Sequence, residues 1–458
     1  MNRKHQKNQM ELAFDMGGRG EATRPVSGGN ELRMAESGTE SPVKIGNVME
    51  EVIKRDNLEK ALKRVKSNKG SPGIDGMTVD ELPAYLKENW TEISENLLAG
   101  TYKPTPVKRV EIPKPGGGIR NLGIPTVLDR FMQQAILQVL QRIFDPTFSD
   151  HSYGFRPGRN AHQAVARAQE YISSGHDWVV DIDLEKFFDR VNHDRLMAGL
   201  AERIQDKRLL KLIRAYLNAG VMVNGLVSPT KEGTPQGGPL SPLLSNIVLD
   251  ELDRELERRG HRFVRYADDC NIYVRSERAG QRVMESTRRF IEKKLKLRIN
   301  EKKSTVSQPM KRKFLGFSFT SGEMVKRRIA PESRARFKDR IRLITRRNRG
   351  ISLDKLIEEL NAYLRGWTAY FGFCQTQSVL DGLNSWIRRR LRSYQWKQWK
   401  RGKVRYAELR KMGVGKDLAA QTAGSTHGIW RISLSPALNI AMPNAFFENL
   451  GLFRLRIR

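Results

Sequence analysis

The chain has 458 residues, of which 39% are hydrophobic, so it is long enough for several domains and apolar enough to build buried cores. Lysine and arginine number 82 against 51 acidic residues, a net charge of +31, and such a balance is typical of proteins that bind a polyanion. From Lys311 to the end there are 32 basic and 10 acidic residues, so we expect the main phosphate-binding surface there. Charge alone does not separate an enzyme from a structural RNA-binding protein.

The two cysteines, Cys270 and Cys374, are far apart and form neither a closely spaced pair nor a zinc set, which predicts a reduced, cytoplasmic location. No apolar run approaches the ~20 residues of a membrane span, and the N-terminus lacks the core of a signal peptide. Residues 1–46 are rich in glycine, serine, asparagine and charge without periodicity, so we predict a mobile extension.

Helical periodicity begins at Asn47. Asp56 is the predicted N-cap of a helix, because Glu59 stands three residues later in the capping-box position. A glycine-rich segment between Gly70 and Gly76 then predicts a loop.

The segment 107–120 reads as strand, glycine turn and strand, which predicts a β-hairpin with Lys114 and Arg120 at or near its tip. On its own, this pattern fits an ordinary surface hairpin with solvated charges equally well. The apolar stripe that follows over 127–143 has helical spacing and predicts core.

The first acidic cluster follows a predicted core strand that starts at Trp178. Asp181 and Asp183 alternate along it and therefore share one face, opposite Val180 and Ile182. An edge strand with a solvated acidic face is the simpler interpretation, but bare carboxylates are costly beside core residues.

The second cluster, Asp268 and Asp269, lies between two apolar runs and is predicted at the tip of a β-hairpin. Adjacent carboxylates repel each other, and their hard oxygen ligands suit Mg²⁺. An Asp-Asp pair alone is often only a turn. Together with a strand-borne Asp it forms the constellation that holds two metal ions for nucleotidyl transfer.

These segments resemble reverse transcriptases. Asp183 with Phe188 five residues later, the run 234–242 (TPQGGPLSP) and Tyr266-Ala267-Asp268-Asp269 are similar to motifs A, B and C of that class. The runs 152–157 (SYGFRP) and 360–367 (LNAYLRGW) are similar to the proteins encoded by bacterial group II introns, which are both reverse transcriptases and splicing maturases. The resemblance extends from about residue 47 to the C-terminus.

The resemblance implies that Asp183 and Asp268 hold two Mg²⁺ ions, with Asp269 in the same cluster. The spacing of Asp181 does not fit motif A, so we leave that residue structural. Phe188 would lie beneath the sugar and exclude a 2′-hydroxyl. Gln236 would line the nucleotide pocket and contact the template base.

Further roles follow from the same resemblance. Lys114 and Arg120 would neutralise the triphosphate of the incoming nucleotide from a fingers hairpin. Lys303 would protonate the leaving pyrophosphate, although Lys302 is only one residue away and stays an alternative. The primer grip would comprise Phe314, Leu315 and Gly316, within a segment 314–319 that alternates like a hairpin strand.

The implied fold is α+β, a right-hand polymerase with fingers, a palm carrying an antiparallel sheet, a helical thumb and a small basic C-terminal domain. Basic and apolar helices are expected over 333–349 and 353–371, and most tryptophans of the last segment are expected in the core. The expected boundaries are 47–175 for fingers, 176–325 for palm, 326–395 for thumb and maturase, and 396–458 for the C-terminal region.

The expected partners are the parent group II intron RNA, an RNA template with a DNA primer, dNTPs and target DNA, with no membrane and with nucleoid association in a bacterial cell. We find no endonuclease signature in the sequence, so we expect no bottom-strand cleavage and a primer taken from a replication fork. Two alternatives stay open. One is another bacterial reverse transcriptase (retron, diversity-generating or defence-associated), and the other is a maturase that only assists splicing.

Overall fold

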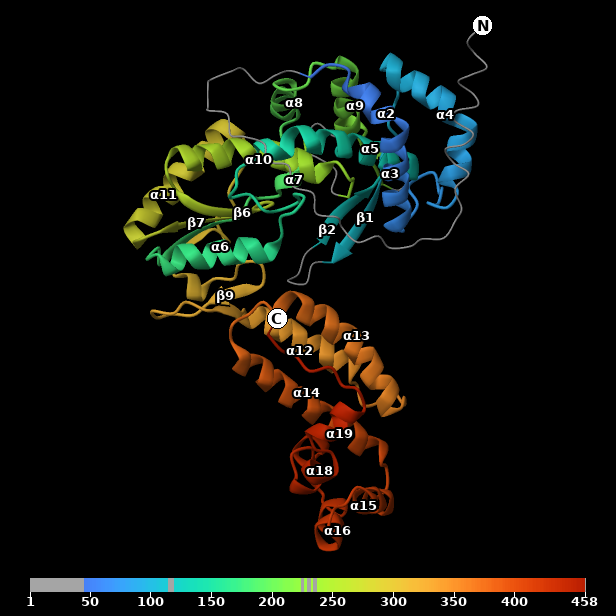
Figure 1. The fold of residues 1–458 in the computed structure, drawn as a ribbon, viewed down its shortest axis with the longest axis vertical. Coiled ribbons are helices and arrows are strands. Elements are labelled where there is room, and N and C mark those ends of the chain that lie inside the picture. The colour runs from blue at the N-terminus through green and yellow to red at the C-terminus, as the bar shows by residue number, and fades with distance from the viewer. Residues whose placement is uncertain (1–44, 114–118, 224–225, 229–231, 234–236, 458) are drawn as a thin grey trace, which may run out of the picture. The chain divides into compact units, whose positions relative to one another are not determined.

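The structure is a computed structural model, and it describes residues 45–113, 119–223, 226–228, 232–233 and 237–457. Two predicted nucleotide-binding residues, Lys114 and Gln236, lie outside these ranges, as does the predicted N-terminal extension up to residue 44. The described chain divides into two compact units (Figure 1). Unit 1 contains the segments up to residue 160, 180–272 and 278–306, and unit 2 contains 161–179, 273–277 and the segment from residue 307 onward.

Unit 1 combines helices with two four-stranded sheets, and unit 2 is mainly helical, so the fold class is α+β. The helices of unit 1 are α2 (Val48–Ile53), α3 (Arg55–Ser67), α4 (Leu82–Ala99), α5 (Val127–Phe144), α7 (Phe187–Arg190), α8 (His193–Ala201), α9 (Lys207–Asn218), α10 (Ser241–Arg258) and α11 (Glu277–Phe290). Short helical turns follow α5 at η1 (Asp145–Thr147) and α11 at η2 (Ile291–Leu295), the latter a π-helix. No helix in the described ranges is both long and apolar enough to cross a membrane.

Local sequence signals explain several helix boundaries of unit 1. Thr126 caps α5 by accepting a hydrogen bond from the backbone N–H of Asp129, and Asp206 caps α9 in the same way. Gly100 ends α4 in the left-handed conformation. The predicted cap at Asp56 is wrong: Lys54 is the N-cap of α3, and Asp56 lies in the first helical turn.

The predicted hairpin of segment 107–120 is confirmed. Strand β1 (Val107–Pro113) pairs antiparallel with β2 (Ile119–Ile124), and this register places Arg120 opposite Ile112. The sheet has the order β2-β1-β4-β5, where β4 (Val221–Val223) and β5 (Leu226–Ser228) are short. Helix α5 lies directly after β2, and its predicted apolar stripe is buried over most of its length.

A second four-stranded sheet, most of whose residues belong to unit 1, has the order β6-β7-β3-β8. Its strands are β3 (Trp178–Ile182), β6 (Arg262–Tyr266), β7 (Asp269–Val274) and β8 (Thr305–Ser307). Val180 and Ile182 of β3 and Phe263 and Val264 of β6 are fully buried. Both predicted acidic clusters therefore lie on or beside strands whose apolar residues are buried in the core.

Unit 2 begins with α6 (Ala161–Ser173) and a two-stranded sheet of β9 (Phe317–Phe319) and β10 (Arg327–Ile329), which follow the short turn η3 (Pro309–Lys311). The predicted strand 314–319 is thus confirmed only from Phe317 onward. Three long helices follow: α12 (Pro331–Ile344), α13 (Leu353–Phe371) and α14 (Gln377–Gln398). The expected helix 333–349 ends at Ile344, whereas the expected helix 353–371 has those bounds.

Aromatic rings fill the core of unit 2 where α6, β9 and the C-terminal end of α13 meet. The ring centroid of Phe317 lies 5.4 Å from that of Phe371 and 6.2 Å from that of His162 in α6. His162 Nε2 forms a hydrogen bond with the carbonyl of Tyr370 at 2.7 Å. Helix α6 is thereby fixed to β9 and the end of α13.

The C-terminal segment of unit 2 contains α15 (Gly402–Lys411), α16 (Lys416–Ala423), α17 (Ile429–Ile432), α18 (Pro436–Ala441) and α19 (Asn444–Asn449). The residues after α19 return along the long helices, because Asn361 of α13 binds the backbone of Gly451 and Phe453, and Asn384 of α14 binds both backbone groups of Leu455. The stretch 360–367 therefore serves in part to hold the chain end. Leu360 and Leu364 are buried in the core, and the side chain of Asn361 forms hydrogen bonds with the backbone of the last residues.

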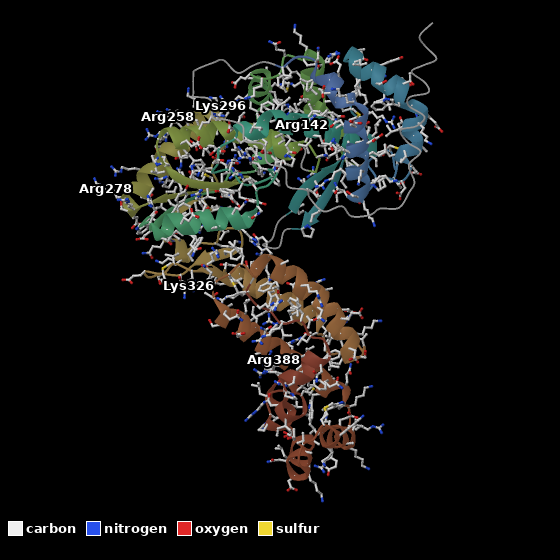
Figure 2. The ribbon with its side chains drawn as sticks, in the orientation of Figure 1. Arg142, Arg258, Arg278, Lys296, Lys326 and Arg388 are labelled. Atoms are coloured by element: carbon white, nitrogen blue, oxygen red, sulfur yellow. The ribbon has the colours of Figure 1, made fainter. Side chains whose placement is uncertain are left out.

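The tryptophans of this unit divide into two groups. Trp396 and Trp399 are buried core, as expected. Trp386 is half-buried with Lys338, Arg342 and Arg390 within 6.0 Å of its ring centroid, and Trp430 lies 3.8 Å from the guanidinium of Arg389. Basic side chains are spread over both units, among them the six labelled in Figure 2.

Candidate active site

Asp183 stands at the end of a buried strand and is held there by its own backbone. Its N–H donates to Ser304 Oγ at 3.0 Å, and its carbonyl accepts from the N–H of Asn300 at 2.8 Å. Because Ile182 before it and Leu184 after it are buried, the residue has little freedom to move along the sheet. The carboxylate itself remains partly exposed, with 28% of the side chain accessible.

Lys303 lies beside this carboxylate. Its Nζ is 3.2 Å from Oδ2 and 3.4 Å from Oδ1 of Asp183. The sequence left Lys302 and Lys303 as alternatives, and Lys303 is the one that this structure brings to Asp183. A cation at this distance compensates the negative charge that a metal ion would otherwise neutralise.

Asp268 and Asp269 occupy the predicted turn between β6 and β7. Ala267 adopts a left-handed conformation with φ of 58°, which is unusual for a residue with a Cβ. Asp268 is half-buried and Asp269 is exposed. The two carboxylates therefore have different surroundings although they are adjacent in sequence.

Gly154 packs directly against the backbone of this turn. A Cβ atom on Gly154 would lie 2.3 Å from the backbone nitrogen of Ala267 and 2.9 Å from the carbonyl carbon of Tyr266. No side chain fits in that space. The glycine of the SYGFRP run is thus explained by close approach of two backbones rather than by a special φ.

The end of β3 lies beside the start of β7. The two strands are neighbours in the sheet, and the charge of Asp181 acts on the thiol of Cys270 together with that of Asp269. Burial is the largest cause that raises the pKa of Cys270. The strand that precedes Asp183 thus borders the strand that follows Asp268.

The donor set suits a divalent cation in chemistry, because carboxylate oxygens are hard ligands. Within the ranges that the structure describes, however, no three Asp, Glu, His or Cys side chains converge on a preformed metal site. Since Asp183 is paired with Lys303, the ligand set is not closed around one point. The residues fit the ion as donors.

Phe187 and Phe188 begin the short helix α7 just after Asp183. Phe187 is 2% exposed and belongs to the core, whereas Phe188 is half-buried. Gly233 fits against their backbone, because a Cβ there would lie 2.7 Å from the carbonyl oxygen of Phe188. The aromatic pair therefore separates into a core ring and a ring with an accessible face.

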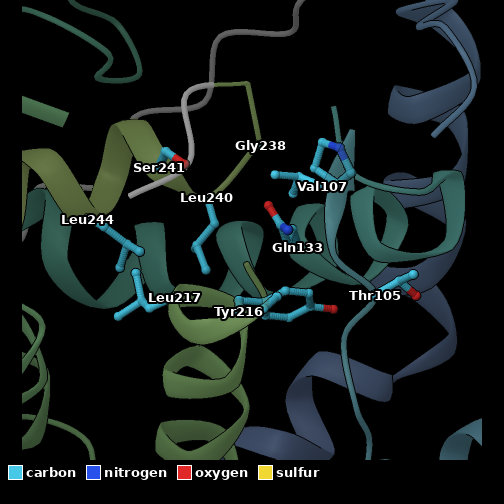
Figure 3. Close-up of a pocket in the computed structure, with 11 residues that line it drawn as sticks. Thr105, Val107, Gln133, Tyr216, Leu217, Gly238, Leu240, Ser241 and Leu244 are labelled. Carbon is cyan, nitrogen blue, oxygen red and sulfur yellow. The ribbon is translucent and has the colours of Figure 1, made fainter. Parts of the chain in front are cut away.

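The glycines after Gln236 lie against the hairpin and helix of the N-terminal part of unit 1. A Cβ on Gly237 would meet the carbonyl oxygen of Gly123 at 2.6 Å, and one on Gly238 would meet Oε1 of Gln133 at 2.4 Å. A cavity of about 20 Å³ lies beside them, lined by Gln133, Tyr216 and Gly238 among others (Figure 3). That volume accommodates about one water molecule and is far too small for a nucleotide.

The proposed primer-grip residues form a tight turn in unit 2. Phe314 and Phe317 exchange both backbone hydrogen bonds at 2.9 Å, and Leu315 and Gly316 between them have φ of 49° and 84°. Two central residues with positive φ are the signature of a type I′ turn. The carbonyl of Leu315 also accepts a hydrogen bond from the hydroxyl of Tyr370 at 2.8 Å.

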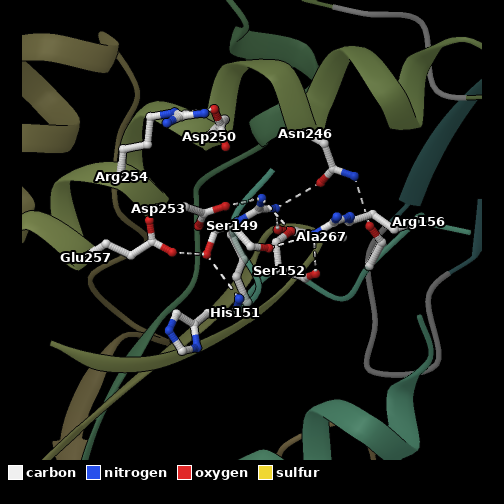
Figure 4. A network of polar contacts seen from close by, with 12 residues as sticks. Ser149, His151, Ser152, Arg156, Asn246, Asp250, Asp253, Arg254, Glu257 and Ala267 are labelled. Atoms are coloured by element: carbon white, nitrogen blue, oxygen red, sulfur yellow. Dashed lines mark hydrogen bonds and ion pairs between the residues drawn. The ribbon is translucent and has the colours of Figure 1, made fainter. Parts of the chain in front are cut away.

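A buried ion pair beside the Tyr266–Asp269 turn was not predicted from the sequence. Arg265 of β6 is fully buried and binds Asp253 and Asn246 of α10 as well as Ser152. These three partners are labelled in Figure 4. A signal was present in the sequence, because Arg265 interrupts an apolar strand and Asp253 interrupts the apolar face of a helix. Two opposite charges that both fall on core positions indicate a buried pair.

Two sequence families match the chain. The family "Reverse transcriptase (RNA-dependent DNA polymerase)" matches residues 112–319, and the family "Group II intron, maturase-specific domain" matches residues 334–413. The first range contains both acidic clusters and all the turns described above. The second covers α12 to α15 almost completely.

Individual relatives also match long stretches of the chain. Protein YkfC of Escherichia coli (strain K12) is 32% identical over 330 residues, which cover 63% of this chain and 86% of that protein. The group II intron-encoded protein LtrA of Lactococcus lactis subsp. cremoris is 31% identical over 334 residues, which cover 58% of this chain and 55% of LtrA. The matched region thus spans about half the length of LtrA.

The similarity to solved structures is weaker. A chain of the "Partial Cas6-RT-Cas1--Cas2 complex" aligns with 54% of this chain and 42% of its own length at 24% identity and a TM-score of 0.35, too low to bear on the function. The sequence matches define the class as reverse transcriptases. Within that class, the chain belongs to the group II intron reverse transcriptases that carry a maturase-specific domain.

Proposed function

We propose that this protein copies RNA into DNA from a primer 3′-hydroxyl at the Asp183–Asp268 site, and that it binds the parent intron RNA to support splicing. The observation that carries the first part is the fixed Asp183 at the end of β3, with Lys303 at 3.2 Å, in the same sheet as the Tyr266–Asp269 turn. The division into fingers, palm, thumb and C-terminal region, with the boundaries given above, is part of the proposal.

Asp183 and Asp268 would hold divalent cations, which we propose to be two Mg²⁺ ions, with Asp269 completing the set. When bound, these ions supply Lewis-acid activation of the primer hydroxyl and charge stabilisation on the triphosphate. Lys303 would leave Asp183 for the leaving pyrophosphate, to which its ammonium group can donate a proton. Phe188 would pack beneath the deoxyribose with the face that the core leaves accessible.

The catalytic assignment is tested by Asp183→Asn and Asp268→Asn, with Asp189→Asn as the matched control, because Asp189 is an exposed carboxylate in α7. We expect each site variant to lose about 1,000-fold or more in primer extension, since a metal ligand contributes several kcal/mol to the transition state. Affinity for the RNA–DNA duplex should hardly change, because it rests on many phosphate contacts elsewhere. Substantial extension by either site variant would disprove the assignment.

The maturase role is supported by the domain match over residues 334–413 and by the basic surface of unit 2. The Arg-rich helices of unit 2 can bind the phosphate backbone of an RNA duplex. The test is splicing of the intron precursor at an Mg²⁺ concentration too low for self-splicing. Protein with Asp268→Asn should stimulate splicing as well as the unaltered protein, and the absence of stimulation by both would refute this part alone.

A further inference from the structure

Arg265 is a charged side chain enclosed in unit 1 between the sheet and α10. Its residue exposure is 0%, and that of Asp253 is also 0%. An unpaired guanidinium would be very costly at such a position. The hydrogen-bond partners of Arg265 therefore indicate which backbone segments this side chain holds in place.

All five N–H groups of Arg265 have acceptors. Nε and Nη2 bind the two carboxylate oxygens of Asp253 at 2.7 and 2.5 Å. Nη1 donates to Asn246 Oδ1 and to the carbonyl of Ala267, both at 3.0 Å, and Nη2 also donates to Ser152 Oγ at 2.8 Å.

These bonds join three segments that are distant in sequence. Besides its side-chain contact, Ser152 precedes Tyr153, whose N–H donates to the carbonyl of Arg265 at 2.9 Å. Asn246 accepts from Arg265 through Oδ1, and its Nδ2 donates a hydrogen bond to the carbonyl of Gly154 at 2.9 Å. The same network thus holds the Gly154 backbone that lies against Ala267.

The contact with the carbonyl of Ala267 is the one that bears on chemistry. That carbonyl belongs to the peptide bond that leads into Asp268, so fixing its direction also fixes the backbone nitrogen and Cα of Asp268. Ala267 has φ of 58°, a conformation that costs an L-residue on the order of 1–2 kcal/mol when nothing holds it. The hydrogen bond from Arg265 Nη1 to the carbonyl of Ala267 helps to hold this conformation.

We propose that Arg265, anchored by Asp253, is a positioning residue that sets the Ala267–Asp268 peptide and thereby aims the Asp268 carboxylate at the metal ions. A buried ion pair is a weak source of stability compared with a well-packed apolar pair. Retaining one here is explained by the directional bonds that only a guanidinium can make to four partners. The inference rests on the proposed role of Asp268 as a metal ligand.

The test compares Arg265→Lys with Arg208→Lys in the full-length protein. Arg208 is the matched control, because it also binds two carboxylates, Asp206 and Glu50, at 2.8 to 3.0 Å in unit 1. The readouts are kcat for primer extension, the Kd of the primer–template, the Mg²⁺ concentration at half-maximal rate and the thermal midpoint.

We expect Arg265→Lys to reduce kcat by roughly 100-fold, the effect of about 1 Å of misplacement, and to raise the half-saturating Mg²⁺ concentration several-fold. The Kd of the primer–template should not change. Arg208→Lys should leave kcat and the Mg²⁺ dependence unchanged at temperatures below its midpoint. A folded Arg265→Lys protein with unaltered kcat and Mg²⁺ dependence would overturn the proposal.

If Arg265→Lys does not fold, Ser152→Ala decides the question, because it removes one acceptor and leaves the ion pair in place. We then expect a smaller loss in kcat together with a raised Mg²⁺ requirement, and normal values for both would reject the positioning role. The metal-ligand role of Asp268 is tested separately. Activity retained by Asp268→Asn would show that Asp268 is not a ligand. If Asp268→Asn is inactive but Arg265→Lys and Ser152→Ala are fully active, only the positioning role is refuted.

Discussion

Replacement of Gly154 by alanine is a direct test of the proposed site, because it changes the Tyr266–Asp269 turn without altering a carboxylate. The added Cβ would lie 2.3 Å from the nitrogen of Ala267, and ordinary contact begins at 3.4 Å. The turn must therefore move by about 1.1 Å. Both obstructing atoms nearest to the Cβ are backbone, so no flexible side chain can give way.

A displacement of about 1 Å at a catalytic group costs on the order of 100-fold in rate, or about 2.7 kcal/mol in the activation free energy. We expect Gly154→Ala to lose this factor in single-turnover primer extension while the Kd of the primer–template stays unchanged. Gly199→Ala is the control, because its Cβ would make an ordinary contact of 3.5 Å with Ile247. A Gly154→Ala protein with unaltered rate would show that the turn is not held against this glycine.

Three further predictions concern neighbouring side chains. Phe188→Ala should lower the preference for dNTP over rNTP on the order of 100-fold in single-nucleotide extension. Phe187→Ala should instead cost about 3–5 kcal/mol of unfolding free energy in denaturant unfolding. The reverse pattern would exchange the roles of the two rings. Lys303→Ala should slow extension by about 10²–10⁴-fold, the range of a lost general acid, and equal losses in Lys302→Ala would contradict the choice of Lys303. Because burial raises the pKa of Cys270, its thiol should resist iodoacetamide at pH 8 in the native protein and react once denatured, and rapid native labelling would disprove this burial.

Local patterns in the sequence sufficed for several parts of the molecule. The strand before Asp183, the hairpin of Asp268 and the helix α13 follow from periodicity and turn residues. These features depend on contacts between residues that are close in the chain. For the same reason the acidic clusters were recognisable as candidate ligands before any fold was known.

The misplaced boundaries also have local causes. Asp56 carried the composition of an N-cap, but Lys54 is the capping residue, and Glu59 binds Arg55 instead of completing a capping box. Leu315 lies in an alternating apolar run, yet it takes a positive φ in a tight turn that the hydroxyl of Tyr370 helps to hold. In both cases the backbone differs from the conformation that the local residue pattern favours: α3 begins at Arg55, and Phe314 and Phe317 close a tight turn through their backbone hydrogen bonds.

What only the tertiary structure decided is which distant residues meet. Lys303 reaches Asp183 across 120 residues, Ser152 reaches Arg265 across 113, and Gly154 lies against Ala267. Periodicity has a range of a few residues, so it indicates that Arg265 and Asp253 are inside but not that they pair or that they hold the carbonyl of Ala267. The acidic residues can thus be recognised as candidate ligands from the sequence. The backbone conformation that leads into Asp268 depends on backbone and guanidinium contacts that form only when the sheet, α10 and the segment 151–154 pack together.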